Sequence, residues 1–243
     1  MAEQEVVKHT KKIYKIWNDK EKSFWHKIKE FLIEIFIIVF AVSLSIWLHD
    51  KSEHNSQQKE VKEFLLGLRE DLLSDIHEMS GDKSAYIEQG RAFAYITSVK
   101  FNGTLNTDSL NKYKNSMTNT TRLQQNNGRF EGFKASGKIG NIEDKTLQND
   151  IMDLYQESIP SLLTSTDVYI RWKNQFFDYG IKNRKKLSDS TTNNSTMLLA
   201  DEAQNLCGYL ANPSEIISRY DFCMEKMKAI VSSIEDKYRL KAK

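Results

Sequence analysis

Proline and glycine are scarce in this chain, which has two prolines and ten glycines among its 243 residues. β-Sandwiches and β-barrels need many tight turns, and such turns are rich in these two residues, so the sequence argues against both architectures. Lysine, glutamate, leucine and glutamine are common instead, and all four form helices readily. We therefore expect an all-α fold.

A large net charge is also missing, since the formal charge is only +2. Proteins that bind nucleic acids neutralise phosphates with a clustered surplus of lysine and arginine. We therefore expect no nucleic-acid partner.

Catalytic signatures are absent as well: there is no G-x-S-x-G, H-E-x-x-H, Walker loop or dinucleotide fingerprint. His49 and His54 lie near two acidic residues, but positions five apart share a helix face poorly. We expect a protein that is not an enzyme, with no catalytic residue, cofactor or metal. The aromatic and basic segment 171–180 has the residues to stack a ligand, although its helical spacing favours a place in the core.

Cysteine is rare, and the only two are Cys207 and Cys223. An oxidising compartment permits a disulfide between them. In a helical hairpin that turns at Asn212, their heights differ by about six residues, or about 9 Å at about 1.5 Å per residue. A bridge needs Cα atoms within about 7 Å. Buried free thiols are therefore favoured, and a disulfide is the alternative.

One long apolar run, FLIEIFIIVFAVSLSIWL at 31–48, stands out from the polar remainder. Glu34 is its one ionisable residue. A run of this length and purity predicts a transmembrane helix, because a core helix of a soluble domain need not be apolar on all sides. No small-residue cleavage site follows it, so we expect a retained anchor and a lipid bilayer as partner.

The lysines predict how this span is oriented. Residues 1–30 carry eight lysines, whereas the twenty-one residues after the span, 49–69, carry three lysines and one arginine. The positive-inside rule then makes 1–30 a cytoplasmic, basic tail and puts the chain after the span outside, in the periplasm if the membrane is a bacterial inner membrane. Ile13, Ile16 and Trp17 alternate with lysines, which fits an interfacial amphipathic helix and a solvated tail equally well.

One face of the span carries small and polar residues at helical spacings: Glu34, Ile38, Ala41 and Ser45. Small residues let membrane helices approach, and a carboxyl group in lipid seeks a partner. We predict a membrane helix–helix interface of a homo-oligomer here, weakened by Glu34→Gln. Snorkelling of Glu34 towards the flanking lysines, or a titrating carboxyl in an ion pathway, are the alternatives.

Residues 49–80 are expected to continue the span as a helical stalk. Apolar residues recur there at spacings of three and four: Val61, Leu65, Leu68 and Leu72. Stalk helices from different copies would bury this seam against one another, as in a coiled coil.

Residues 81–243 are expected to form an extracytoplasmic helical domain, with five or six helices outside the membrane and no strand. The expected helices cover about 83–99, 107–119, 142–186, 197–210 and 213–240, with a kink at Pro160. Breaks are expected at 102–103, at the polar stretch 118–128 and at the SDSTTNNST loop. Asn141 and Asn212 are expected to cap the helices that follow them.

Three blocks together resemble one protein family. Glu34, Ile35 and Ile38 fit an E-I-x-x-[IV] pattern. A stalk pattern follows at Glu60, Glu63, Leu65, Leu68, Asp71, Leu72 and Asp75. The most specific block is FEGFKASGKIGNIEDKTLQNDIMDLY at 130–155. The family is an uncharacterised one, a domain of unknown function, of bacterial single-pass inner-membrane proteins; Ala41 stands where it has glycine. The resemblance implies this topology and a helical outer domain, and brings no known activity.

We therefore expect a non-enzymatic single-pass inner-membrane protein whose periplasmic helical domain self-assembles or binds partner proteins. A periplasmic ligand-sensing helical bundle is one alternative. An accessory subunit of a membrane transport or secretion complex is another.

Overall fold

The computed structural model describes residues 23–103, 105–187 and 192–240, together with residues 7, 11 and 14. The expectations for Ile13, Ile16 and Trp17 in the tail, and for residues 188–191 of the SDSTTNNST loop, lie outside these residues. The described chain is helical, with no strand and one isolated antiparallel bridge between Lys186 and Thr192. The all-α prediction is confirmed. The chain divides into two compact units, 1–60 and 61–243.

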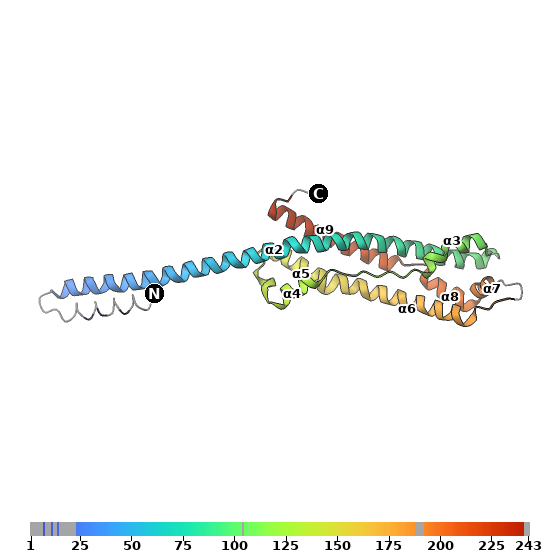
Figure 1. Ribbon diagram of the computed structural model, residues 1–243, viewed down its shortest axis with the longest axis horizontal. Helices are drawn as coiled ribbons and strands as arrows, with labels where there is room; N and C mark the ends of the chain where they lie inside the picture. Colours follow the sequence, from blue (N-terminus) through green and yellow to red (C-terminus); the bar gives the residue numbers. More distant parts are fainter. Residues whose placement is uncertain are drawn as a thin grey trace. The chain divides into compact units, whose positions relative to one another are not determined.

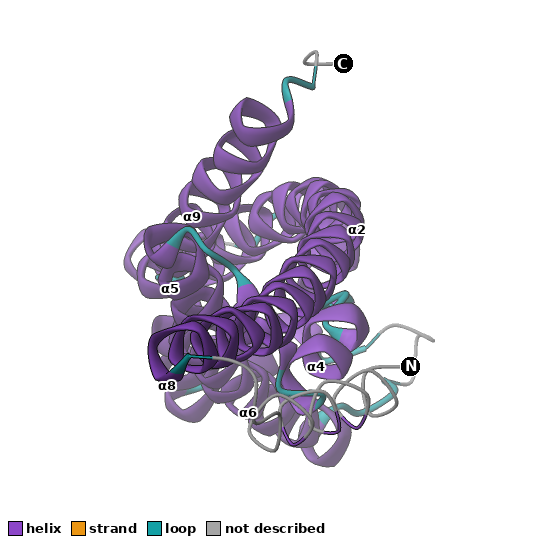
Figure 2. Cartoon of the chain, turned by 90° about the vertical axis from the view of Figure 1, so that its left-hand side faces the viewer, coloured by secondary structure: helices purple, strands orange, loops and turns teal. Residues whose placement is uncertain are grey.

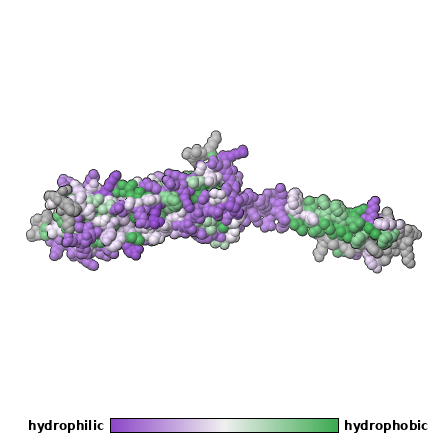
Figure 3. Space-filling view, turned by 180° about the vertical axis from the view of Figure 1, so that it is seen from behind, coloured by the Kyte–Doolittle hydropathy of each residue, from purple (hydrophilic) through white to green (hydrophobic). Residues whose placement is uncertain are grey.

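The first unit contains the beginning of helix α2 (Phe24–Asn102). Along 31–48 nearly all large apolar side chains of α2 are exposed, and Figure 3 shows them as a continuous apolar surface. Among the described residues, α2 alone holds a stretch long and apolar enough to cross a membrane. The prediction of one candidate membrane span therefore holds by length and composition.

The second unit is built on three long helices: the part of α2 from Val61 onward, α6 (Ile159–Asn183) and α9 (Ser214–Tyr238). Figure 1 shows α6 following the direction of α2, and α9 returning in the opposite direction; Figure 2 shows the same helices end on. The shorter elements are α3 (Thr107–Thr118), α4 (Gly128–Ala135), the 3₁₀ helix η1 (Lys138–Asn141), α5 (Lys145–Asp153), the π-helical turn η2 (Leu154–Ser158), α7 (Asn194–Leu199) and α8 (Asp201–Leu210).

The three long helices meet around Tyr86 of α2. Its ring centroid lies 5.4 Å from that of Tyr169 on α6 and 5.8 Å from that of Tyr220 on α9. About two helical turns further along α2, Phe93 packs edge-on against Phe176, with ring centroids 5.2 Å apart. The two pairs with α6 are edge-to-face and the pair with α9 is tilted. Aromatic pairs of this kind add directional stability to apolar burial, so these contacts help to fix how α6 and α9 sit on α2.

An extended segment, residues 119–127, runs back along α2 between α3 and α4 (Figure 1). Side chains of α2 satisfy its backbone: Glu78 accepts from the N–H of Gln124 at 2.8 Å, and Asp75 accepts from the N–H of Asn126 at 3.1 Å. A backbone outside helices needs such partners when it is buried. We call residues 119–127 the return segment.

The turn between α8 and α9 packs closely on α2 at Gly90. A Cβ atom at this position would lie 2.6 Å from Cδ of Pro213, closer than atoms can pack. Glycine is therefore required here by space rather than by backbone angles.

Several boundaries differ from the expectations. The predicted stalk and the helix at 83–99 are one continuous helix up to Asn102, with the predicted break at Gly103, whose φ is +78°. Asp144, rather than Asn141, caps α5, because its side chain accepts from the N–H of Leu147 at 3.0 Å. The predicted helix 197–210 is interrupted at Ala200, whose extended backbone separates α7 from α8.

The predicted kink at Pro160 takes the form of the π-helical turn η2 immediately before it. Proline has no N–H to donate and its ring crowds the preceding turn, so the helix widens by one residue there. Ser158 fills part of this opening, since its hydroxyl donates to the carbonyl of Asp153 at 3.3 Å.

The predicted stalk seam requires a correction. Val61, Leu65, Leu68 and Leu72 are each 0% exposed and belong to the hydrophobic core of their own chain. Phe64 in the same stretch stacks on Phe133 at 4.0 Å. Since a side chain buried this way is not available to a second copy, packing of this seam between stalks is not supported. The compact second unit accordingly begins at Val61 rather than at residue 81.

Candidate functional site

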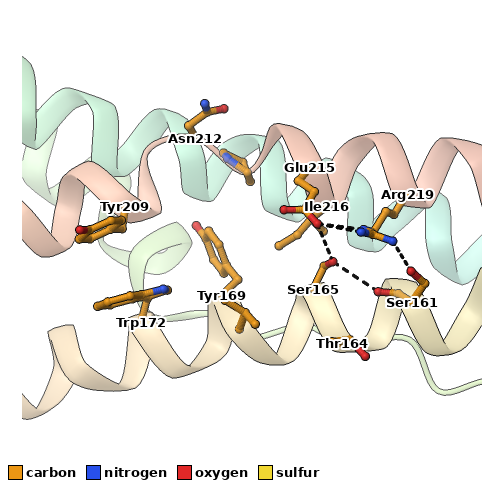
Figure 4. Close-up of a pocket in the computed structure, with 12 residues that line it drawn as sticks. Ser161, Thr164, Ser165, Tyr169, Trp172, Tyr209, Asn212, Glu215, Ile216 and Arg219 are labelled. Atoms are coloured by element: carbon orange, nitrogen blue, oxygen red, sulfur yellow. Dashed lines mark hydrogen bonds and ion pairs between the residues drawn. The ribbon is translucent and has the colours of Figure 1, made fainter.

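A cleft of about 400 Å³ lies in the second unit, between α6 on one side and α8, α9 and their connecting turn on the other (Figure 4). Twelve residues line it: Ser161, Thr164, Ser165, Val168, Tyr169, Trp172, Tyr209, Asn212, Pro213, Glu215, Ile216 and Arg219. Its volume falls in the range of small-molecule sites. Half of these residues are apolar or aromatic and half are polar. Figure 4 shows Trp172 and Tyr209 at one end of the cleft and Glu215, Arg219 and Ser161 at the other.

The aromatic end is formed by Trp172 of α6 and Tyr209 of α8. Their rings stack nearly in parallel, with centroids 4.5 Å apart and an interplanar angle of 12°. Tyr209 is 63% exposed, so its outer face is open to solvent. Tyr169 lies beside the pair and is held by a hydrogen bond from its hydroxyl to the carbonyl of Leu210 at 3.0 Å.

The polar end is organised by the first turns of α9. Glu215 and Arg219 are four residues apart and therefore face the same side of the helix, where Nε and Nη2 of Arg219 donate to the Glu215 carboxylate at 3.0 Å. Ser165 of α6 donates to the same carboxylate at 3.1 Å, and Arg219 also donates to the hydroxyl of Ser161. The donors Arg219 and Ser165 lower the pKa of Glu215, which is thus ionised at neutral pH.

The predicted cap at Asn212 is placed differently in the structure. Helix α9 begins at Ser214, and the side-chain oxygen of Asn212 accepts from the N–H of Ser214 at 3.3 Å. Glu215 does not close a capping box with this turn but forms the ion pair in the cleft. The sequence motif therefore predicted the start of the helix correctly, whereas the role that it predicted for Glu215 differs from the one in the structure.

The aromatic segment 171–180 divides between two faces of α6. Trp172 lines the cleft, whereas Phe176 and Tyr179 are buried in the core. The place in the core is therefore confirmed for Phe176 and Tyr179, whereas ligand stacking at Trp172 stays a prediction.

Lys173, in the same segment, is a buried cation. It is 1% exposed, and its ammonium group donates to the side-chain oxygen of Gln89 at 2.6 Å and to the carbonyl of Asn119. Asn119 is the residue that ends α3, so the ammonium lies at the negative end of that helix dipole. Burial lowers the pKa of Lys173 to about 8.

The predicted interface residues in the span lie on α2 in the first unit. Glu34 is 3% exposed, whereas Ala41 and Ser45 are exposed and Ile38 is partly buried. The hydroxyl of Ser45 donates to the carbonyl of Ala41 at 2.8 Å, as serines in membrane helices commonly do. Whether this face contacts a second copy stays a prediction.

The two cysteines are buried and unbridged. Cys207 on α8 is 0% exposed and Cys223 on α9 is 1% exposed. Burial raises the pKa of Cys207 to about 12 and that of Cys223 to about 11, so both thiols are protonated and unreactive at neutral pH. The structure has the free thiols that helix geometry favoured.

Among the described residues, no three His, Cys, Asp or Glu side chains are grouped so that they could hold a metal ion. His49 lies 4.0 Å from Glu53, four residues further along the helix, and both are well exposed. The described acidic side chains at the outer end of the span thus make only a local helical contact there.

Sequence reasoning missed most of the cleft. It singled out Trp172 only as part of an aromatic segment, and it did not mark Tyr209, Ser165 or Arg219. The spacing of Glu215 and Arg219 was a usable signal for a helical ion pair. The stacking of Trp172 on Tyr209 had no signal, because the two residues are brought together only by the packing of α8 on α6.

The fold and these features define an all-α protein with one candidate membrane span and a helical domain that contains a mixed polar and aromatic cleft. Comparisons of the chain with protein families, with curated proteins and with solved structures give no match.

Proposed function

We propose that this chain is a non-enzymatic, single-pass inner-membrane protein whose extracytoplasmic helical domain binds partner proteins or further copies of itself. The observation that carries the proposal is the exposed apolar surface of α2 along 31–48, next to a second unit with a closed core of its own. Exposed apolar surface of this extent belongs in lipid. An independent core outside that segment is what an anchored binding domain requires.

The lysines support the orientation in this proposal. Eight of them precede the span, and their excess favours a cytoplasmic N-terminus and a periplasmic second unit. Membership of the uncharacterised family suggested by the sequence blocks agrees with this topology and is proposed with it.

A homo-oligomer is supported by the face of the span that holds Glu34, Ala41 and Ser45. Ala41 and Ser45 are small and exposed, so they permit close helix approach, whereas Glu34 on the same face is only 3% exposed within its own chain. The stalk seam no longer contributes to this part of the proposal, since it lies in the core. Assembly would therefore be centred on the membrane segment.

A second candidate function is a ligand-sensing module, which the cleft between α6, α8 and α9 favours. A role as an accessory subunit of a transport or secretion complex agrees with the first candidate and differs only in the partner.

Mild-detergent extraction from native membranes, followed by mass spectrometry and particle sizing, tests the proposal. We expect the chain to leave the membrane as a particle larger than one copy, with either itself or a reproducible second protein as the additional component. A strictly monomeric particle without a co-purifying protein, in two unrelated mild detergents, would contradict it.

A further inference from the structure

The cleft combines features that restrict the chemistry of its ligand. Its two charged residues, Glu215 and Arg219, form an ion pair, so the polar end has no net charge. A ligand with a single positive charge would meet the guanidinium of Arg219, and one with a single negative charge would meet the carboxylate of Glu215. Neither is favoured over a neutral, polar molecule.

The polar end also offers both kinds of hydrogen-bonding group. The donors from Arg219 and Ser165 all converge on Oε1 of Glu215, so Oε2 is available as an acceptor. Arg219 has five N–H groups, and the bonds to Glu215 and Ser161 use three of them. The hydroxyl of Ser161 accepts from Arg219 and keeps its own hydrogen to donate. A hydroxyl group, which both donates and accepts, matches this mixture better than a group that does only one.

The aromatic end favours a ring with C–H bonds on one face. Tyr209 has an exposed ring, and stacking on Trp172 holds that ring in a fixed plane. A pre-organised aromatic surface of this kind binds apolar faces with little loss of side-chain freedom. A pyranose ring has such a face, and its edge carries hydroxyl groups.

We propose that the cleft binds a neutral saccharide, with a ring face against the exposed face of Tyr209, whose other face is covered by Trp172, and hydroxyl groups at Glu215, Arg219 and Ser161. This inference rests on the second candidate function, the ligand-sensing module, and names its ligand class.

The distribution of tryptophan supplies a direct measurement. The chain has four tryptophans, and Trp17, Trp25 and Trp47 all precede the second unit. Replacing these three by phenylalanine leaves Trp172, which lines the cleft, as the single tryptophan reporter. This full-length variant is purified in a polyoxyethylene detergent, because detergents with sugar headgroups would compete. Its fluorescence is titrated with chitotriose, with maltotriose and with phenylalanine.

We expect a saturable change with at least one of the two saccharides. Tyr209→Ala and Glu215→Gln should each raise the dissociation constant about tenfold. Both side chains are largely exposed, so circular dichroism should show an unchanged helical content. Phe222→Ala is the matched control: Phe222 is an aromatic residue of α9 that is 53% exposed and lies outside the cleft lining, and its loss should not alter binding.

Three results would overturn the proposal. The first is the absence of a saturable change with both saccharides in a folded protein. The second is saccharide binding that Tyr209→Ala and Glu215→Gln leave intact. The third is a response to phenylalanine alone, which would show a zwitterion site instead and leave the ligand-sensing function standing. Co-purification and particle size address the first candidate function separately, so its failure is distinguishable from each of these.

Discussion

At the residue scale, the buried ammonium of Lys173 has the clearest physical consequence. Its partners are a neutral amide, Gln89, and a backbone carbonyl, that of Asn119, and the ammonium nitrogen lies 5.9 Å from the ring centroid of Phe177. Neither partner neutralises the charge, and burial disfavours it. The buried charge of Lys173 therefore lowers the free energy of unfolding at neutral pH. Because this effect requires the charged form, it should depend on pH.

The sign of this dependence follows from the pKa. Burial lowers the pKa of Lys173 from 10.5 in the unfolded chain to about 8 in the folded one. Between these two values the unfolded chain binds more protons, so the free energy of unfolding rises as the pH increases. The full effect is limited to about 3 kcal/mol.

We predict that thermal unfolding of the full chain in detergent shows a contribution to stability that grows from pH 8 to pH 10 and is lost in Lys173→Met. The buried tyrosines Tyr86, Tyr169 and Tyr220, whose pKa values are raised by burial, titrate alike in both proteins and cancel in the comparison. Parallel pH profiles for the two proteins would show that Lys173 keeps an ordinary pKa.

At the scale of the element, helix α2 offers a matched pair of glycines. Gly90 lies against Pro213, whereas a Cβ atom at Gly81 would meet no atom within 4 Å. Both positions are in the interior of the same helix, where alanine is intrinsically favoured over glycine by about 1 kcal/mol.

We predict opposite signs for the two substitutions. Gly81→Ala should raise the free energy of unfolding by about 0.5–1 kcal/mol. Gly90→Ala should lower it by about 1–2 kcal/mol, because the rigid proline ring and the α8–α9 turn would have to move. Chemical denaturation followed by helical circular dichroism measures both; stabilisation by Gly90→Ala would mean that α9 is not seated on α2 as described.

The elements also show what the sequence was able to predict. The sequence located α3, α9 and the end of α6 within a few residues. The buried faces of α6 and α9 repeat at the helical period, whereas α3 has no buried residue and was bounded only by the predicted breaks on either side of it. The sequence predicted one long helix with a kink at Pro160, and α5, η2 and α6 do follow one another without a break. The sequence did not predict that the kink is a π-helical turn, because that depends on how the carbonyl groups freed by the proline are satisfied. The return segment was read correctly as non-helical. Its contacts with Asp75 and Glu78 had no local signal, since they join residues 46 or more positions apart.

The membrane segment carries an element-scale prediction of its own. If the face with Glu34 joins two copies, Glu34→Gln should weaken self-association and Glu34→Leu should weaken it further, because the polar contact is worth about 1 kcal/mol in lipid. Val39→Ala, at an exposed position of the same helix, is the control. Sedimentation in a mild detergent gives the dissociation constants; equal values for all variants would remove Glu34 from the interface.

At the scale of the whole molecule, the apolar segment and the second unit differ in how far they can be predicted from the sequence. The long apolar helix that could span a membrane was predicted almost completely, because length and the near absence of charge suffice to identify such a helix. The leucines that follow the apolar segment have the same helical spacing in the sequence whether they pack between two chains or within one chain. Only the tertiary packing decides in favour of the core, and the contacts of this stretch with α4 and α9 join residues more than fifty positions apart.

The cleft illustrates the same limit. Its residues come from α6, α8 and α9, and no single stretch contains enough of them to form a pattern. Local spacing identified Glu215 next to a helix start, but its pairing with Ser165 depends on the packing of two helices. Sites assembled in this way are visible only once the tertiary contacts are known.

The orientation of the chain in the membrane tests the central claim most directly. The full chain is fused at its C-terminus either to alkaline phosphatase, which is active only in the periplasm, or to a green fluorescent protein that fluoresces only in the cytoplasm. Both fusions are expressed in a Gram-negative host, together with versions in which the eight lysines of residues 1–30 are replaced by glutamine. We predict an active phosphatase and a dark fluorescent protein for the natural sequence, and a shift towards the opposite pattern without the lysines. A fluorescent, phosphatase-negative natural chain would contradict the account.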